Sequence, residues 1–164
     1  MIKMIVCCDI NGGIGYKNDL LFSISEDMQF FKKMTTGHKV VMGYNTWLSL
    51  PKKPLPNREN YVLYDGEEEI EGVTILRTFD EVKELGKRED IFIIGGAMVY
   101  NDLVYLGMID EAFVTHVSSF SMADKYIDLE ELNRQLPHRE YLKDFHCGNM
   151  KIQLFRYYKN KIYI

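Results

Sequence analysis

The stretch Ile91-Phe-Ile-Ile-Gly-Gly-Ala-Met-Val-Tyr100 decides the fold. Four large apolar residues without alternation predict a strand covered on both faces, as in the middle of a mainly parallel sheet. Gly95 and Gly96 end this strand and let the backbone approach a ligand, where the next helix offers unpaired N–H groups and a positive end. The stretch therefore predicts a site for a phosphate-bearing ligand. A tight turn with nothing bound fits equally well, because the full Gly-x-Gly-x-x-Gly pattern is absent.

The composition predicts a globular chain with a single domain, residues 1–164. Asp plus Glu number 24 and Lys plus Arg 20, and no basic block stands out, so we expect no nucleic-acid partner. The apolar start is interrupted at Asp9, too soon for a signal peptide, and no run is long enough to span a bilayer. We expect a cytoplasmic protein without a membrane partner, and a monomer.

The three cysteines, Cys7, Cys8 and Cys147, do not form a recognisable framework. The adjacent pair lies in a strand-like segment and indicates small apolar filling rather than a disulfide. There is no Cys-x-x-Cys or metal-ligand spacing, so we expect no metal site.

The N-terminal part predicts a strand, a loop and a helix in that order. Residues 2–8 are apolar and β-prone, and residues 9–24 form a long glycine-rich loop. A mobile segment after a central strand is more often functional than not, although a plain connector has the same composition. Ser25 offers an N-cap, and we expect the helix to run to about Thr35.

Asp27 is an anomaly on this helix. It shares a face with Phe30, Phe31 and Met34, at spacings of three, four and seven residues, so a carboxylate lies on the stripe expected to be buried. The pattern alone favours the plain interpretation, in which a first-turn acid stabilises the helix dipole. The functional interpretation is a partly desolvated carboxylate that holds a cationic or amidine-like ligand group by charge-assisted hydrogen bonds.

A second strand end leads into a helix at Gly43. Residues 38–43 predict a buried strand and residues 43–47 open a short helix, so one extended ligand could cross both junctions. The proline-pinned loop 50–58 carries Arg58, which could clamp a carboxylate. A solvated surface arginine is at least as good an interpretation of Arg58 on its own.

The later elements continue the alternation of strands and helices. Strands are expected at 60–63, 73–76 and 111–117, and Thr78 with Glu81 forms a capping box for a helix to about residue 86. Residues 141–145 and 151–158 predict an antiparallel hairpin at one edge of the sheet. The predicted fold is an α/β three-layer sandwich with a mixed, mostly parallel central sheet and a C-terminal antiparallel hairpin.

The order and spacing of the motifs resemble dihydrofolate reductase over almost the whole chain. The matching positions are Ile14, Gly15, Asn18, Asp27, Phe31, Thr35, residues 40–43, Thr46, Trp47, Leu55, Pro56, Arg58, Ile94, Gly95, Gly96, Tyr100, Thr115 and His116. The separate pieces are weak, whereas their order together is specific. The resemblance implies a dihydrofolate reductase-like fold and hydride transfer from a reduced nicotinamide dinucleotide to C6 of dihydrofolate, while N5 gains a proton. Antifolates are then expected ligands.

The resemblance also implies residue roles. Asp27 would hold the pterin's 2-amino group and N3, with Thr115 bonded to that carboxylate, and the proton would arrive through water. Arg58 would fork onto the glutamate α-carboxylate. The other catalytic positions would be Leu20, the last residue of a lid at residues 15–20 that excludes water, and Phe22 just after this lid. The other substrate-binding residues would be Ile5, Cys7, Met28, Phe31, Leu50, Leu55 and Ile94. The cofactor-binding residues would be Cys7, Ile14, Gly15, Asn18, Gly43, Tyr44, Asn45, Thr46, Leu63, Tyr64, Asp65, Gly95, Gly96, Ala97, Met98, Val99 and Tyr100.

The first loop departs from the family pattern. Phe22 stands where the family usually has tryptophan, and Leu21 stands where it usually has proline. An indole hydrogen bond that helps to order water near the substrate is therefore missing. His116, although part of the resemblance, is expected to be packed or hydrogen-bonded rather than catalytic.

The adenosine end departs as well. Tyr44, Asp65 and Met98 replace the Arg, Lys, Ser or Thr residues that usually surround the 2′-phosphate of NADPH. A phosphate dianion that faces an aspartate is unfavourable, whereas a carboxylate suits the free 2′-hydroxyl of NADH. We therefore predict a weakened preference for NADPH over NADH. The alternatives are compensation by Lys39, Arg77 or another basic residue, and a shift of the family match by one residue in the loop after Leu63.

Two other functions stay open at this point. A related reductase on the same scaffold could act on a different pterin or pyrimidine, although a substrate without a glutamyl tail has no use for Arg58. A catalytically weakened folate- or nucleotide-binding module is the other, in view of Phe22 and the altered adenosine-side positions.

Overall fold

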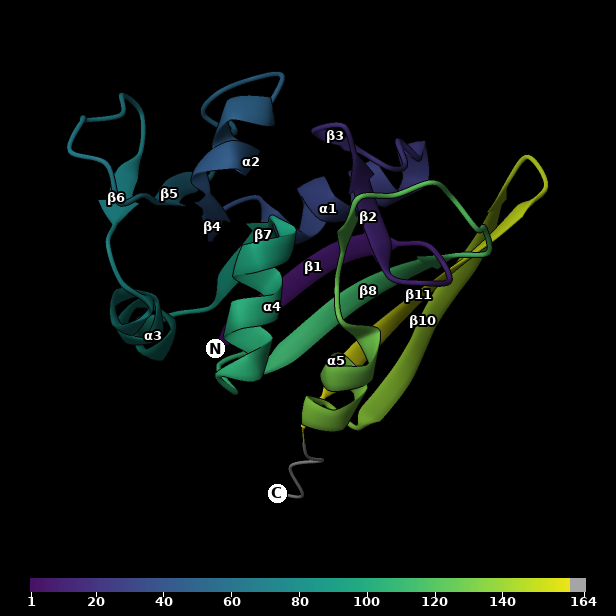
Figure 1. The fold of residues 1–164 in the computed structure, drawn as a ribbon. Helices are drawn as coiled ribbons and strands as arrows, with labels where there is room; N and C mark the ends of the chain where they lie inside the picture. Colours follow the sequence, from purple (N-terminus) through teal and green to yellow (C-terminus); the bar gives the residue numbers. More distant parts are fainter. Residues whose placement is uncertain (160–164) are drawn as a thin grey trace.

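The computed structural model describes residues 1–159 and contains an eight-stranded sheet and a three-stranded sheet (Figure 1). The strand order in the larger sheet is β10-β11-β8-β1-β7-β4-β5-β6. The bounds are β1 Ile2–Cys8, β4 Lys39–Gly43, β5 Glu59–Leu63, β6 Thr74–Leu76, β7 Ile91–Gly95, β8 Glu111–Val117, β10 His138–Cys147 and β11 Met150–Tyr158. Every neighbouring pair from β8 to β6 is parallel, whereas β11 is antiparallel to both β8 and β10. The predicted mixed sheet with a C-terminal hairpin is confirmed.

Strand β7 lies in the interior of the sheet, between β1 and β4, as its apolar run predicts. Ile91, Phe92 and Ile93 are each at most 1% exposed. Ile91 and Ile93 belong to one hydrophobic core, and Phe92 belongs to the core on the other face. This strand is therefore covered on both faces, which explains why its sequence does not alternate.

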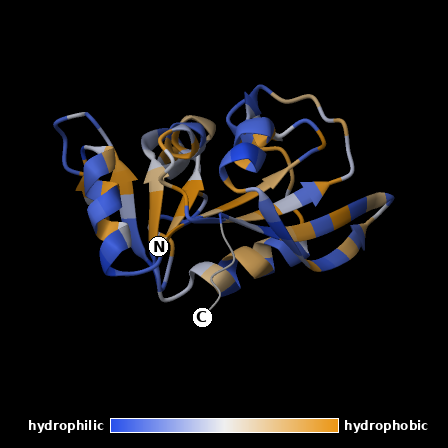
Figure 2. Ribbon diagram, turned by 90° about the horizontal axis from the view of Figure 1, so that it is seen from below, coloured by the Kyte–Doolittle hydropathy of each residue, from blue (hydrophilic) through white to orange (hydrophobic). Residues whose placement is uncertain are grey.

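Helices cover both faces of the large sheet. The first core joins the sheet to residues of α3 (Phe79–Arg88), α4 (Ala97–Tyr105) and α5 (Leu129–Gln135). The second core joins it to residues of α1 (Ser25–Thr35) and α2 (Tyr44–Ser49). Figure 2 shows mainly hydrophobic central strands, whereas the hairpin of β10 and β11 alternates between hydrophobic and hydrophilic residues. The hairpin is therefore covered on one face only.

The expectation of a loop over residues 9–24 is wrong in part. Two short strands, β2 (Gly13–Tyr16) and β3 (Asp19–Leu20), lie within it and form the small sheet with β9 (Lys125–Tyr126), in the order β3-β2-β9. The pairing of β2 with β9 joins segments more than a hundred residues apart. Glycine-rich sequence carries little strand signal of its own, so this sheet depends on a distant partner.

Local signals place most helix boundaries, with one correction. Thr78 caps α3 as predicted, since its hydroxyl oxygen accepts a hydrogen bond from the Glu81 N–H at 3.2 Å. Ser25, however, is the first residue of α1, and Ile24 occupies the cap position without a side-chain cap bond. Ile24 is only 3% exposed and packs in a small core with Val117 and Ile152. Tertiary packing therefore sets this helix start. No helix among residues 1–159 has the length and apolar character to cross a membrane.

Candidate active site

The centre of the candidate site is a hydrogen bond between two elements far apart in sequence. The Thr115 hydroxyl, on β8, donates to Oδ1 of Asp27, on the first turn of α1, with 2.6 Å between the oxygens. Thr115 is 2% exposed, whereas Asp27 is partly exposed. Cys7 lies opposite Thr115 in the register of β1 and β8. The anomalous acid of the helix stripe therefore faces the sheet and not bulk solvent.

The surroundings of Asp27 oppose its ionisation. Burial raises the pKa of the Asp27 carboxyl, and the Thr115 hydroxyl, the Cys7 thiol and the Lys143 ammonium partly offset this effect. Burial, followed by the negative charge of Asp27, raises the pKa of the Cys7 thiol. Asp27 is thus a partly desolvated carboxyl group, held by a buried hydroxyl and still partly accessible, which suits recognition of a ligand's N–H groups.

The second part of the candidate site is the tightly packed turn of Gly95 and Gly96 at the end of β7. Gly95 has φ +133°, a backbone conformation that residues with side chains rarely adopt, and the Gly95–Gly96 peptide is cis. A Cβ at Gly95 would lie 3.3 Å from Oγ1 of Thr46 and 3.6 Å from the hydroxyl oxygen of Tyr100. Gly96 occupies the N-cap position of α4 and has no side chain that could accept a hydrogen bond from the first N–H groups of the helix. The turn therefore presents bare backbone at a helix start.

Tyr100 connects the turn to the Asp27 side of the sheet. Its hydroxyl donates to the carbonyl of Ile5, on β1, at 2.7 Å. Burial raises the pKa of the Tyr100 hydroxyl, and the negative charge of Asp27 raises it further. Tyr100 is 4% exposed. Through Tyr100 and β1, the acid and the glycine turn belong to one region of the molecule.

Apolar side chains around Asp27 are incompletely covered. The partly buried side chains packed against the second core include four of the expected substrate-binding residues, Phe31, Leu50, Leu55 and Ile94. Ile5 is 6% exposed, whereas Met28 is 57% exposed. Partly exposed apolar side chains and a partly desolvated carboxyl suit a flat, mainly apolar ligand with one polar edge.

Arg58 is held in place before any ligand arrives. Its Nε donates to the Pro56 carbonyl at 2.9 Å, and its Nη1 donates to Oγ1 of the buried Thr35 at 3.1 Å. Its guanidinium carbon lies 5.9 Å from the centre of the Phe31 ring. Burial lowers the pKa of Arg58. The arginine thus lies next to the apolar wall formed by Phe31, unlike an unattached surface arginine.

Asp9, to which the sequence assigned no role, anchors the turn that precedes the expected lid at residues 15–20. One Asp9 oxygen accepts from the backbone N–H groups of Asn11 and Gly13 at 2.9 and 2.8 Å, and the other from Ser121 at 3.0 Å. Asp9 is fully buried, whereas Leu20 at the far end of the segment is 81% exposed. An Asp at a strand end, with Asn-Gly-Gly beginning two residues later, signals such a turn. Three other expected site residues lie in the same segment. Ile14 is buried, and Asn18 has a positive φ of +67°. Phe22 packs on the core around Ile24.

The predicted adenosine side lies at the carboxyl ends of β4 and β5. The rings of Tyr44 and Tyr64 lie 4.4 Å apart. Arg77 donates from Nη1 to the Tyr64 carbonyl at 2.8 Å and also to the Gly66 carbonyl. Asp65 is exposed, as are Asn45 and Met98. Leu63, Ala97 and Val99 are only partly buried and pack against the first core. The structure therefore brings an arginine, Arg77, to the predicted adenosine side.

His116 is partly buried and hydrogen-bonded within the sheet. Its Nε2 is hydrogen-bonded to the hydroxyl of Tyr157 at 2.7 Å. Burial, followed by the charge of Arg139, lowers the pKa of His116 to about 4. His116 and Thr115 are successive residues of β8, so their side chains point to opposite faces of the sheet. The expectation that His116 is hydrogen-bonded and not catalytic agrees with this position.

The chain is similar to known proteins over nearly its whole length. The sequence profile of the family described as dihydrofolate reductase matches residues 1–157. Dihydrofolate reductase of Ureaplasma parvum is 33% identical over 163 residues, which cover 98% of each chain. Dihydrofolate reductase of Bacillus subtilis is 34% identical over 139 residues, 83% of this chain and 81% of the relative. A solved structure described as dihydrofolate reductase from Enterococcus faecalis complexed with NADP(H) and RAB-propyl aligns with a TM-score of 0.81 and 23% identity, and it covers 98% of this chain and 97% of its own.

Proposed function

The chain belongs to the dihydrofolate reductase family, and we propose that it transfers a hydride from a reduced nicotinamide dinucleotide to C6 of 7,8-dihydrofolate. A proton is added at N5, and the products are tetrahydrofolate and the oxidised cofactor. The observation that carries the proposal is the Thr115–Asp27 hydrogen bond of 2.6 Å beside partly exposed apolar side chains. The bound cofactor supplies the hydride, and the protein positions the two reactants and provides the electrostatic field around them.

Asp27 is proposed to bind the pterin edge. Its carboxylate accepts hydrogen bonds from the 2-amino group and N3, and the Thr115 hydroxyl fixes its orientation. A negative charge at this position favours the protonated substrate, and the proton reaches N5 through water. Phe31 and Leu50 contact the flat rings, and Arg58 pairs with the glutamate α-carboxylate. The exposed Leu20 belongs to the segment that excludes water from the reacting atoms.

The residues at the two strand ends fit a dinucleotide. Gly96 leaves the first N–H groups of α4 without a side-chain cap, and Gly43 does the same for α2. Such free donors at helix starts suit phosphate groups. Thr46 and Tyr100 surround the Gly95 backbone, which is where the nicotinamide half would lie. An activity assay tests the whole proposal: loss of nicotinamide absorbance that depends on dihydrofolate supports it. Folate binding without turnover by either cofactor would instead indicate a binding module.

We further propose that the preference for NADPH over NADH is weakened. The exposed Asp65 would repel a 2′-phosphate, while Nη1 of Arg77 is already engaged by the carbonyls of Tyr64 and Gly66. Lys39 does not compensate, because it lies at the opposite end of β4 and pairs with Glu59 and Glu89.

Steady-state kcat/KM with each cofactor tests this preference. We expect the NADPH to NADH ratio to lie below about a hundredfold and Asp65→Ser to raise it about tenfold, the equivalent of one charge repulsion of about 1.4 kcal/mol. Arg77→Ala should change the ratio little, because Nη1 of Arg77 already serves the carbonyls of Tyr64 and Gly66, and a marked fall would instead show that Arg77 compensates. Arg88→Ala removes an exposed charge at the end of α3 and should leave the ratio unchanged. A wild-type ratio of a hundredfold or more would refute the proposal. Antifolate binding, a cytoplasmic location and a monomeric state stay predictions.

A further inference from the structure

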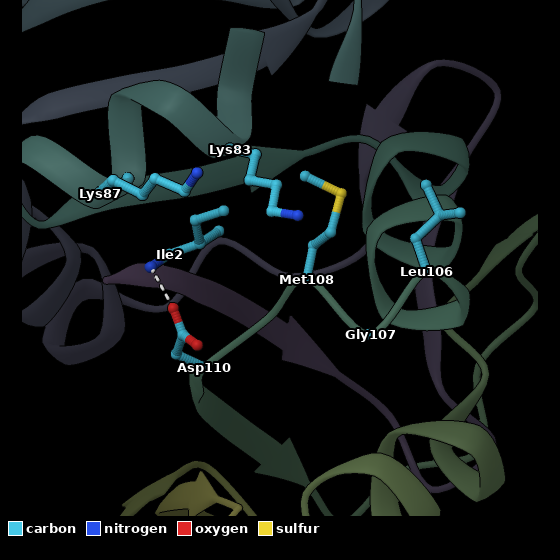
Figure 3. Close-up of a pocket in the computed structure, with 8 residues that line it drawn as sticks. Ile2, Lys83, Lys87, Leu106, Gly107, Met108 and Asp110 are labelled. Atoms are coloured by element: carbon cyan, nitrogen blue, oxygen red, sulfur yellow. Dashed lines mark hydrogen bonds between the residues drawn. The ribbon is translucent and has the colours of Figure 1, made fainter. Parts of the chain in front are cut away.

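A cavity lies at the amino end of β1, away from the candidate active site. We call it the α3 pocket; it has a volume of about 250 Å³ and is lined by Ile2, Lys83, Gly86, Lys87, Leu106, Gly107, Met108 and Asp110 (Figure 3). These residues come from β1, from the last turns of α3 and from the connection between α4 and β8. Cys7 lies five residue steps beyond Ile2 on β1, a distance of about 16 Å along the strand. The pocket can therefore be filled while the active site is occupied.

The pocket is built into the contact between α3 and β1. A Cβ at Gly86 would come within 2.4 Å of Cγ1 of Ile2, so glycine is required for the helix to lie this close. The Met1 ammonium donates to the Gly86 carbonyl at 2.7 Å, which fixes the start of the chain against the helix end. The Lys159 ammonium donates to the Gly107 carbonyl at 2.8 Å on the other side. These bonds hold the walls from both sides.

The wall of the pocket contains two lysines, of which one is already paired. Asp110 is engaged, since its Oδ2 accepts from the Ile2 N–H at 2.7 Å. Lys87 pairs with Glu84 at 2.9 Å, and both side chains are 60% exposed. Lys83 has no ion pair among residues 1–159. Lys83 and Lys87 are four residues apart on one helix face, where like charges repel each other. Glu84 offsets part of this repulsion through its pair with Lys87, and an anion between the two lysines would add the partner that Lys83 lacks in the described part of the chain.

The remaining wall is apolar. Figure 3 shows the Lys83 side chain ending near Met108, and Lys87 extending toward Ile2. Leu106 adds apolar surface and is itself 58% exposed. We propose that the α3 pocket binds a small amphipathic anion, whose acid group lies between Lys83 and Lys87 and whose apolar body contacts Ile2 and Met108. A volume of about 250 Å³ suits a ligand of about a dozen non-hydrogen atoms.

Titration of the full chain with naphthalene-2-carboxylate, followed by amide NMR shifts, tests the proposal. We expect saturable shifts at Gly86, Gly107 and Met108, with the same affinity whether or not saturating NADPH and methotrexate are present. Naphthalene-2-carboxamide, which has the same shape without the charge, should bind about fivefold more weakly. This readout does not depend on turnover, so its failure is distinct from failure of the proposed reductase activity.

Matched variants test the role of the two lysines. The double variant Lys83→Ala, Lys87→Ala should bind the carboxylate about fivefold more weakly, and Lys151→Ala, at an exposed position of β11, should bind it like the wild type. Both pocket lysines are exposed, so the fold should persist, which the amide spectrum verifies directly. The proposal is overturned by absent shifts at the pocket, by equal affinity for acid and amide, by unchanged binding to the double variant, or by shifts that active-site ligands abolish.

Discussion

Replacing Asp27 by asparagine keeps the shape of the side chain but removes its charge. In the proposed complex the carboxylate accepts two hydrogen bonds from the pterin, and each bond to a charged group contributes about 1.5–3 kcal/mol. Loss of both therefore removes about 3–6 kcal/mol of transition-state stabilisation, or about a hundredfold to ten-thousandfold in kcat/KM. We expect Asp27→Asn to lose most activity at neutral pH.

The same substitution should not destabilise the protein. Because burial raises the pKa of Asp27, the folded state binds a proton more readily than the unfolded chain does. Ionised Asp27 thus lowers the free energy of unfolding at neutral pH, and this cost disappears as the pH falls through the folded-state pKa. The asparagine variant should be at least as stable as the wild type near pH 7 and lose any advantage in acid.

The assay measures kcat/KM with dihydrofolate, together with urea unfolding monitored by circular dichroism. Glu26→Gln is the matched control, because it removes an exposed negative charge from the adjacent position of α1. We expect that control to retain its activity. Near wild-type turnover by Asp27→Asn would remove Asp27 from the mechanism, and unfolding of the variant at neutral pH would show that the carboxylate is primarily structural.

Three further predictions concern other parts of the molecule. Arg58→Gln should raise KM for dihydrofolate about 10- to 100-fold, because a charge-assisted pair with the glutamate is lost. A substrate analogue without the glutamate tail should react equally well with the wild type and the variant. Equal losses for both substrates would contradict the assignment of Arg58. Gly95→Ala places a side chain on a residue with φ +133° and should lower the free energy of unfolding by about 1–3 kcal/mol. Gly96→Ala should cost less, because Gly96 has an ordinary φ. Urea titrations that rank the two variants in the opposite order would contradict the strain argument. His116, with its pKa lowered to about 4, should stay neutral above about pH 5 in an NMR titration. The unfolded chain binds this proton more tightly, so the free energy of unfolding should rise by up to about 3 kcal/mol as the pH increases from 4 to 6.5. A folded-state midpoint near 6.5 would show that the ring is hydrated.

The sequence by itself determined the elements whose signals are local. The unalternating run from Ile91 predicted a strand covered on both faces, and the Thr78 capping box predicted the start of α3. The acid on the apolar stripe of α1 marked Asp27 as unusual, because a buried carboxylate needs a partner wherever it lies. The order of these motifs was specific enough to imply the family.

Only the tertiary structure decided which distant groups meet. The partner of Asp27 is Thr115, 88 residues away, and no local pattern gives that pairing. The same applies to β2, whose glycines form a strand only because β9 lies beside them, and to the start of α1, where packing of Ile24 outweighed the capping preference of Ser25. Propensities and caps contribute about 1 kcal/mol or less at each position, whereas burying one large apolar side chain contributes about 1.5–3 kcal/mol, so long-range packing decides where the two disagree.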